Sequence, residues 1–185
     1  MITQYADCPV DGPPKSTLGV KADPELYELR HLALGMVAPE IEGEDIDGKT
    51  RKLSDYRGRI VVLSFWASWC GPCLQMIRHE RTLAERLAGK PFALVGVNSD
   101  VDRAEAKRAL EREQISWRSF WDVTNGNDGP ISTAFNIKGW PTVYVLDPKG
   151  VIRLKFVGFG SSNQLLNGTV EHLLRELADA KEKTR

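Results

Sequence analysis

Cysteine and histidine are scarce in this chain, and their scarcity excludes several kinds of site. The 185 residues include three cysteines and three histidines: Cys8, Cys70, Cys73, His31, His79 and His172. A structural zinc site needs four ligands, usually from two close pairs, and this chain has one close pair. Three cysteines also do not make the disulfide framework of a small secreted domain. We therefore expect no metal site, and we interpret Cys8 as an incidental thiol, with an intermolecular disulfide as the alternative.

The chain also lacks an excess of charge of either sign and any long apolar run. It has 25 Lys plus Arg and 25 Asp plus Glu, which predicts no basic surface for nucleic acid. No apolar run approaches the ~20 residues of a transmembrane helix. Residues 1–11 have neither the basic start nor the apolar stretch of a signal peptide. A hydrophobic content of 42% is enough for the core of one ordinary domain.

One short motif does carry chemistry. The segment Trp69-Cys70-Gly71-Pro72-Cys73 follows the apolar run 60–66 and precedes a helical pattern. A Cys-x-x-Cys at such a junction is typical of a redox dithiol. At a helix N-terminus, unpaired N–H groups and the positive dipole end would stabilise a thiolate at Cys70. Cys73 would lie within disulfide reach on the same helical face, and Pro72 suits the first helical turn.

Other interpretations of this motif are weaker. Covalent haem attachment needs His directly after the second cysteine, and that position is Leu74. A purely structural disulfide would close a very small loop and constrain the chain little. We therefore predict Cys70 as the nucleophile and Cys73 as the thiol that resolves the mixed disulfide.

Two segments together resemble a known family. Residues 65–73 are similar to the active-site segment of the thioredoxin superfamily, and Gly139-Trp140-Pro141-Thr142 resembles its cis-proline loop. The long spacing between these landmarks is similar to the TlpA-like and redoxin (AhpC/TSA-related) branch, which carries an insertion there. The resemblance covers roughly residues 36 to 180 and extends to three further segments: 38–40, 47–49 and 53–58.

The resemblance implies an α/β fold, a thioredoxin-like three-layer α/β/α sandwich with a central mixed sheet over residues 36–180. We expect residues 1–35 to be a flexible extension with a short helix over 23–34, and 181–185 to be a charged tail. That short helix either packs on the domain or ends a preceding module. The patterns predict a hairpin over 41–53, strands at 59–66, 92–97, 117–121, 143–146 and 152–156, a helix capped by Asp100 that ends near Gln114, a loop through Gly129, and helices over 131–135 and 166–177.

The resemblance also implies how substrate binds. Pro141 is expected in the cis form, facing the dithiol, and the expected substrate-binding residues are Trp69, Gly71, Pro72, Trp140 and Pro141. Trp66 would either join this apolar rim or belong to the core. The alternatives are that Pro141 begins an edge strand and that the tryptophans are ordinary packing residues.

The chain departs from the family pattern where a proton acceptor is expected. Thioredoxins carry a buried Asp at the position of Ser64, and many TlpA-like proteins carry Glu at the position of Met76. We expect Glu80, two helical turns beyond Cys73, to be too distant and too exposed to replace them. Bound water is then the expected acceptor for the Cys73 proton.

Taken together, these features predict a cofactor-free thiol–disulfide oxidoreductase that reduces protein or small-molecule disulfides and is recharged by an unidentified thiol donor. One alternative is a redoxin-type peroxidase, but its Pro and Thr or Ser are replaced by Leu63 and Ala67. Another is a thioredoxin-fold interaction module of a larger assembly. The resemblance implies an extracytoplasmic location if an export signal is missing from this sequence, and a cytoplasmic one otherwise.

Overall fold

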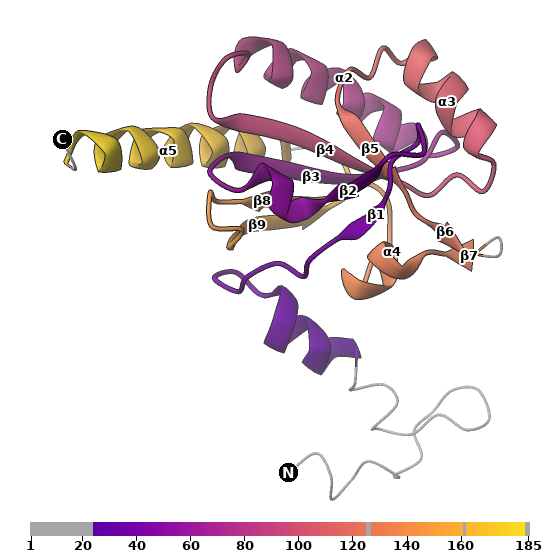
Figure 1. Ribbon diagram of the computed structural model, residues 1–185, viewed down its shortest axis with the longest axis horizontal. Helices are drawn as coiled ribbons and strands as arrows, with labels where there is room; N and C mark the ends of the chain where they lie inside the picture. The colour runs from indigo at the N-terminus through magenta and orange to yellow at the C-terminus, as the bar shows by residue number, and fades with distance from the viewer. Residues whose placement is uncertain (1–23, 125–126, 161, 184–185) are drawn as a thin grey trace, which may run out of the picture.

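A five-stranded mixed sheet forms the centre of the protein (Figure 1). The computed structural model describes residues 24–124, 127–160 and 162–183. The strand order is β5-β4-β3-β8-β9; β4 pairs in parallel with β3 and β5, whereas β8 pairs antiparallel with β3 and β9. The strands are β3 (Ile60–Trp66), β4 (Phe92–Asn98), β5 (Arg118–Trp121), β8 (Thr142–Leu146) and β9 (Ile152–Val157). The predicted mixed sheet is confirmed.

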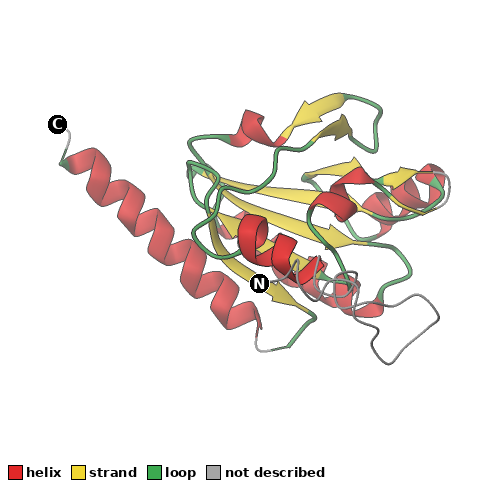
Figure 2. Cartoon of the chain, turned by 90° about the horizontal axis from the view of Figure 1, so that it is seen from below, coloured by secondary structure: helices red, strands yellow, loops and turns green. Residues whose placement is uncertain are grey.

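Helices cover both faces of this sheet, which gives the predicted three layers. The helices are α2 (Gly71–Arg86), α3 (Arg103–Arg112), α4 (Pro130–Ala134) and α5 (Ser162–Glu182). Apolar residues of α2 and α5 pack on the face that carries Ile60 and Val62, and α3 packs beside α2 against Trp66. α4 lies on the opposite face with the N-terminal segment. The long helix α5 runs beyond the edge of the sheet (Figure 2).

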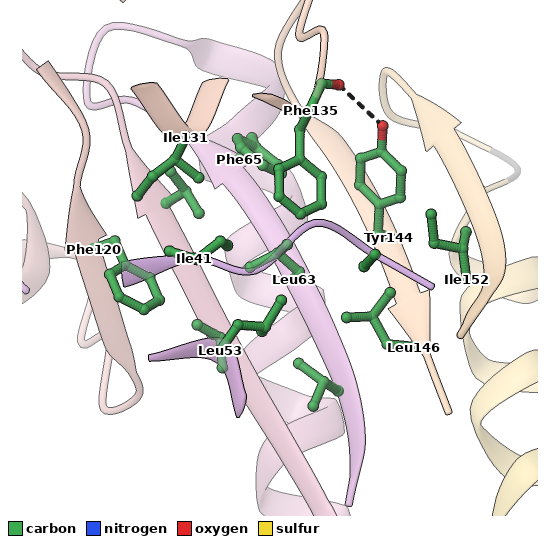
Figure 3. Packing of buried hydrophobic residues seen from close by; sticks show 14 of the residues in the cluster. Ile41, Leu53, Leu63, Phe65, Phe120, Ile131, Phe135, Tyr144, Leu146 and Ile152 are labelled. Carbon is green, nitrogen blue, oxygen red and sulfur yellow. Dashed lines mark hydrogen bonds between the residues drawn. The ribbon is translucent and has the colours of Figure 1, made fainter. Parts of the chain in front are cut away.

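The core explains why β3 reads as an uninterrupted apolar run. All seven residues of β3 are buried, because strands flank it on both sides and helices cover both faces. On the α4 side, Phe65, Phe135 and Tyr144 pack ring against ring at tilted or edge-on angles (Figure 3). The Tyr144 hydroxyl donates a hydrogen bond to the Phe135 carbonyl, which satisfies the one polar group of the cluster.

The N-terminal helix packs on the domain. Residues 24–27 are α-helical and continue into a π-helical turn over Glu28–Leu32. The Tyr27 hydroxyl donates to the Ala134 carbonyl, Glu28 pairs with Lys155, and Leu32 is buried in the core. The predicted cap Asp23, Cys8 and the rest of residues 1–23 lie outside the described residues, as do 184–185.

Two local predictions need correction. The segment predicted as a loop through Gly129 contains a small hairpin formed by β6 (Val123–Thr124) and β7 (Asn127–Asp128). The side chain that caps α3 belongs to Asp102, which accepts from Ala104 N–H, and not to Asp100. The predicted hairpin over 41–53 is confirmed, with β1 (Glu42–Glu44) and β2 (Thr50–Lys52) joined through Gly48 in a left-handed conformation.

No helix within the described residues is both long and apolar enough to cross a membrane.

Candidate active site

The close cysteine pair lies where β3 gives way to α2. Cys70 is the N-cap of α2, and its sulfur accepts a hydrogen bond from the Cys73 backbone N–H at 3.2 Å. The two side chains form a disulfide with Cα atoms 5.2 Å apart. Cys70 is 5% exposed and Cys73 is 0% exposed. An incoming thiolate or disulfide therefore meets Cys70 first, and a thiolate there would have both an N–H donor and the positive helix end beside it.

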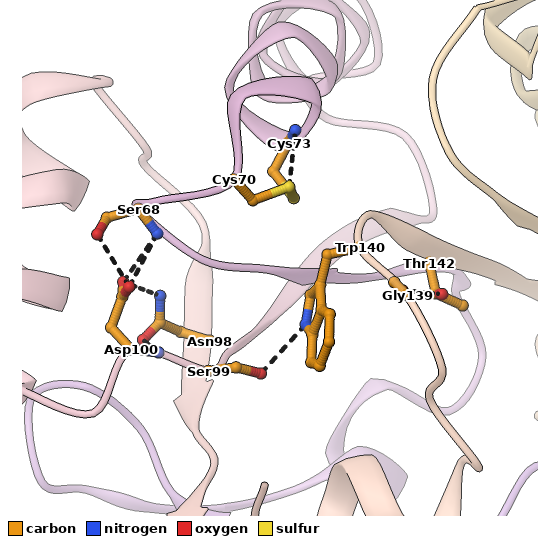
Figure 4. The surroundings of a disulfide bond; sticks show 9 residues. All are labelled: Ser68, Cys70, Cys73, Asn98, Ser99, Asp100, Gly139, Trp140 and Thr142. Atoms are coloured by element: carbon orange, nitrogen blue, oxygen red, sulfur yellow. Dashed lines mark hydrogen bonds between the residues drawn. A yellow bond between two sulfur atoms is a disulfide. The ribbon is translucent and has the colours of Figure 1, made fainter. Parts of the chain in front are cut away.

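The turn before this pair is held by a buried carboxylate. Asp100 accepts from Ser68 N–H at 2.9 and 3.0 Å, from Ser68 Oγ at 2.9 Å and from Asn98 Nδ2 at 2.7 Å (Figure 4). The Asp100 carboxylate therefore binds this turn, and Asp102 caps α3 instead. Sequence reasoning missed this role because the main partner lies 32 residues away in the chain.

Apolar side chains surround the dithiol. Trp69 is 63% exposed and packs edge to face on the half-buried Trp140, with ring centroids 5.6 Å apart. Trp140 lies on the opposite side of the dithiol from α2, anchored by its Nε1 donating to Ser99 Oγ at 3.3 Å (Figure 4). Trp66, in contrast, is 1% exposed and belongs to the core, so it does not line this surface.

The predicted cis-proline loop joins the same surface. The Trp140–Pro141 peptide bond is cis, as expected, and Pro141 directly precedes the buried strand β8. The Gly158 N–H donates to the Pro141 carbonyl at 2.8 Å. This bond places the exposed residues Val157 and Phe159 beside the loop. Gly71 and Pro72 are exposed at the start of α2, whereas the ring of Pro141 is buried. Of the five predicted substrate-binding residues, Pro141 alone has no exposed or half-buried side chain.

Glu80 contradicts our expectation that it is exposed. Its side chain is 0% exposed, and within the described residues neither carboxylate oxygen makes a hydrogen bond of normal geometry. Burial raises the pKa of Glu80 to about 7, and the neighbouring Ser64 hydroxyl opposes that shift only in part. The signal was present in the sequence: Glu80 occupies the helical stripe of buried residues formed by Cys73, Met76, Ile77 and Leu83.

The described part of the chain contains no cluster of side chains that could bind a metal ion. No group of three or more His, Cys, Asp and Glu side chains in residues 24–124, 127–160 and 162–183 is arranged to hold a metal ion. His79 is half-buried and pairs with Asn167, whereas His172 pairs with Glu176 on the surface of α5.

A thioredoxin-like sheet with a close cysteine pair at the start of the following helix defines the class of thiol–disulfide oxidoreductases. Sequence comparison agrees. The chain is 32% identical to the thioredoxin-like protein YneN of Bacillus subtilis over 127 residues, which are 67% of this chain and 71% of that protein. It is 26% identical to the thiol-disulfide oxidoreductase ResA of Geobacillus kaustophilus over 131 residues, 71% of this chain and 73% of ResA.

Structural comparison gives the same class. The crystal structure of a Chlorobium tepidum protein assigned as thiol:disulfide interchange protein DsbE matches with a TM-score of 0.70 at 30% identity. The match covers 77% of this chain and 98% of that one. The model of the AhpC/TSA family matches residues 34–155. The chain belongs to the AhpC/TSA family and is an oxidoreductase of the thiol–disulfide type.

The buried carboxylate predicts a pH dependence of stability. Folding raises the pKa of Glu80 from 4.5 to about 7, so the folded protein holds this proton more tightly than the unfolded chain. The resulting stabilisation is fully present below pH 4.5 and is lost as the pH rises through about 7. A shift of this size corresponds to about 3 kcal/mol.

Urea unfolding of the oxidised protein between pH 4.5 and 8 measures this effect against Glu80→Gln. The free energy of unfolding of the wild type should fall relative to the variant across that range. Parallel pH profiles for the two proteins would show that Glu80 does not titrate as stated.

Proposed function

We propose that this protein reduces disulfides of substrate proteins, with Cys70 as the attacking thiol and Cys73 as the resolving thiol. The observation that carries the proposal is the difference between the two sulfurs. Cys70, at the N-terminus of α2, keeps a small exposed area of 5%, whereas Cys73 behind it is 0% exposed. Only Cys70 can reach a bulky substrate, and only a neighbour on the same helix turn can displace that substrate afterwards.

The exchange proceeds in two balanced steps. The Cys70 thiolate attacks one sulfur of the substrate disulfide, forming a Cys70–substrate bond while the other substrate sulfur leaves as a thiolate. The Cys73 thiolate then attacks the Cys70 sulfur, which forms the Cys70–Cys73 disulfide and releases the second substrate thiolate. The substrate gains two electrons and the dithiol loses two. An external dithiol or thiol donor must return them, and the protein needs no other cofactor for this cycle.

The surface around Cys70 suits an extended peptide. Trp69 and Trp140 offer aromatic side chains, and the exposed residues Gly71 and Pro72 follow Cys70, with open space where a side chain on Gly71 would lie. We assign substrate contact to these four residues and to Pro141. Aromatic side chains with a wet edge bind apolar peptide segments at low entropic cost, which favours partly unfolded proteins over small disulfides as substrates.

A peroxidase function has less support. Leu63 and Ala67 occupy the positions where the peroxidase signature has Pro and Thr or Ser, and both are fully buried apolar residues. Ala67 lacks the hydroxyl that Thr or Ser would use to donate a hydrogen bond to peroxide bound at Cys70. The interaction-module alternative would use the N-terminal helix as the end of a preceding module. That helix instead contacts the domain itself through Tyr27, Glu28 and Leu32.

The compartment in which the protein works depends on whether an export signal precedes this sequence. If an export signal precedes this sequence, we infer extracytoplasmic substrates and a donor on the same side of the membrane. Without one, the same chemistry would serve a cytoplasmic thiol pool.

Trapping experiments test the order of attack. In a Cys8→Ser background, Cys73→Ser should accumulate a mixed disulfide between Cys70 and a denatured disulfide-containing protein such as insulin, because the resolving thiol is missing. Cys70→Ser should accumulate none, because buried Cys73 cannot reach the substrate. Non-reducing electrophoresis and peptide mass analysis identify the cross-linked residue. If Cys70→Ser traps substrate and Cys73→Ser does not, the two roles are reversed.

Stopped-flow oxidation by hydrogen peroxide separates the two enzymatic alternatives. The reduced protein should react no faster than an ordinary thiol of similar pKa, because the peroxidase signature is absent. In a Cys8→Ser background, Cys70→Ser provides the background signal from Cys73 alone. A reaction orders of magnitude faster than that of a free thiol would contradict the proposed function and favour a peroxidase.

A further inference from the structure

Glu80 is a buried acid that the two exchange steps leave without a task. Burying a carboxyl group with no hydrogen-bonding partner costs free energy, so such a group is rarely kept without a compensating use. Replacing it by an apolar residue of the same stripe would remove that cost. Its position on α2, seven residues after Cys73, places it on the same helical face as the resolving thiol.

The packing of α2 on β3 brings Glu80 and Cys73 to the same strip of the sheet. Cys73 and Ile77 cluster with Trp66 of β3, whereas Leu83 clusters with Ile60 and Val62. α2 therefore runs down β3 from its end towards its start. Ser64 lies between Val62 and Trp66 on the same face of the strand, so its hydroxyl lies beneath the stretch of α2 that separates Cys73 from Leu83.

The separation of the two groups along α2 sets the length of the path that the proton must take. Seven residues of helix correspond to ~10 Å along the axis. Side chains on a helix lean towards its N-terminus, so the carboxylate of Glu80 extends back towards Cys73 and shortens that gap. The Ser64 hydroxyl lies close enough to influence Glu80, and a hydroxyl both accepts and donates a proton.

We propose that Glu80 accepts the proton of Cys73 when that thiol resolves the mixed disulfide, through the Ser64 hydroxyl and intervening water. This inference rests on the proposed function. The proton leaves the Cys73 thiol and ends on the Glu80 carboxylate, and the resulting thiolate attacks Cys70 as described above. When a donor later reduces the Cys70–Cys73 disulfide, Glu80 returns the proton to the departing Cys73 thiolate.

The electrostatic surroundings leave Glu80 free for this task. A pKa of about 7 lets the group both take and return a proton near neutral pH. No charged side chain among the described residues contributes to its pKa shift. From β3 it faces the Ser64 hydroxyl. On α2, His79 pairs with Asn167, Arg81 donates to Gln114 and the Glu113 carbonyl, Arg86 pairs with Glu171, and Arg78 and Glu85 are exposed.

Glu80 takes the place of the buried Asp that thioredoxins carry at the position of Ser64. The position of Ser64 carries no carboxylate in this chain, and Glu80 supplies one from the facing helix. The two positions point into the same buried space from opposite sides. A carboxylate moved from one position to the other should therefore recover the function.

Single-turnover quench-flow with the reduced Cys8→Ser protein and a disulfide peptide separates the two exchange steps. Glu80→Gln should leave formation of the Cys70 mixed disulfide unchanged. Its resolution at pH 7 should slow by about 100-fold, the lower range for loss of a general base. Glu85→Gln, an exposed glutamate on the same helix, is the matched control and should behave as wild type.

The pH profile distinguishes proton transfer from a structural role. In the wild type, resolution should fall about tenfold per pH unit below 7, because Glu80 must be ionised to accept the proton. In Glu80→Gln the break near pH 7 should disappear, and the rate should keep rising about tenfold per pH unit until the Cys73 thiol itself ionises. Glu80→Leu guards against poor folding of the amide variant, and Ser64→Asp added to Glu80→Leu should recover at least part of the lost rate.

An unchanged pH profile in Glu80→Gln, whatever its rate, overturns this proposal while the proposed function stands. Failure of the wild type to form any mixed disulfide overturns the proposed function itself.

Discussion

The hydrogen bonds between Asp100 and Ser68 hold the turn between β3 and α2, and the position of the cysteine pair depends on this turn. β3 is buried along its whole length, so its end is fixed in the sheet. Asp100 ties the turn that follows to the end of β4 through four hydrogen bonds, three from Ser68 and one from Asn98. The helix then starts at a defined place, with Cys70 at its N-cap and Cys73 behind it. One backbone amide, one hydroxyl and one side-chain amide, all donating to Asp100, thus position the start of α2 and its two cysteines.

The surroundings of the dithiol differ on its two sides. One side is apolar and accessible, formed by Trp69, Trp140 and the loop before β8. The other side is buried and, among the described residues, contains one unpaired acid, Glu80, facing Ser64. In our proposals, substrate exchange uses the first side and proton exchange uses the second. The acid lowers the stability of the folded protein at neutral pH, which is the kind of local conflict that proteins retain at functional sites.

Much of this arrangement follows from local sequence patterns. The apolar run of β3 and the Cys-x-x-Cys after it reflect immediate neighbours, and the buried strand and the helix that starts at this pair are confirmed. Asp100 and Glu80 were misassigned because their roles depend on distant parts of the chain. An aspartate just before a helix resembles a cap, and only the folded turn shows its bonds to Ser68. A glutamate on a helix with many charged residues is expected to be exposed. Its burial can be predicted only if its position in the apolar stripe is given more weight than its charge.

The reduction potential of the Cys70–Cys73 pair tests the central claim most directly, because a protein that reduces disulfides must hold its own electrons at low potential. The pair can be equilibrated with glutathione at pH 7 and its oxidised fraction read by alkylation and mass. The Gly71-Pro72 dipeptide between the cysteines is the one found in thioredoxin, so the account predicts about −270 mV. A value near about −120 mV, typical of a strong oxidant, would contradict it.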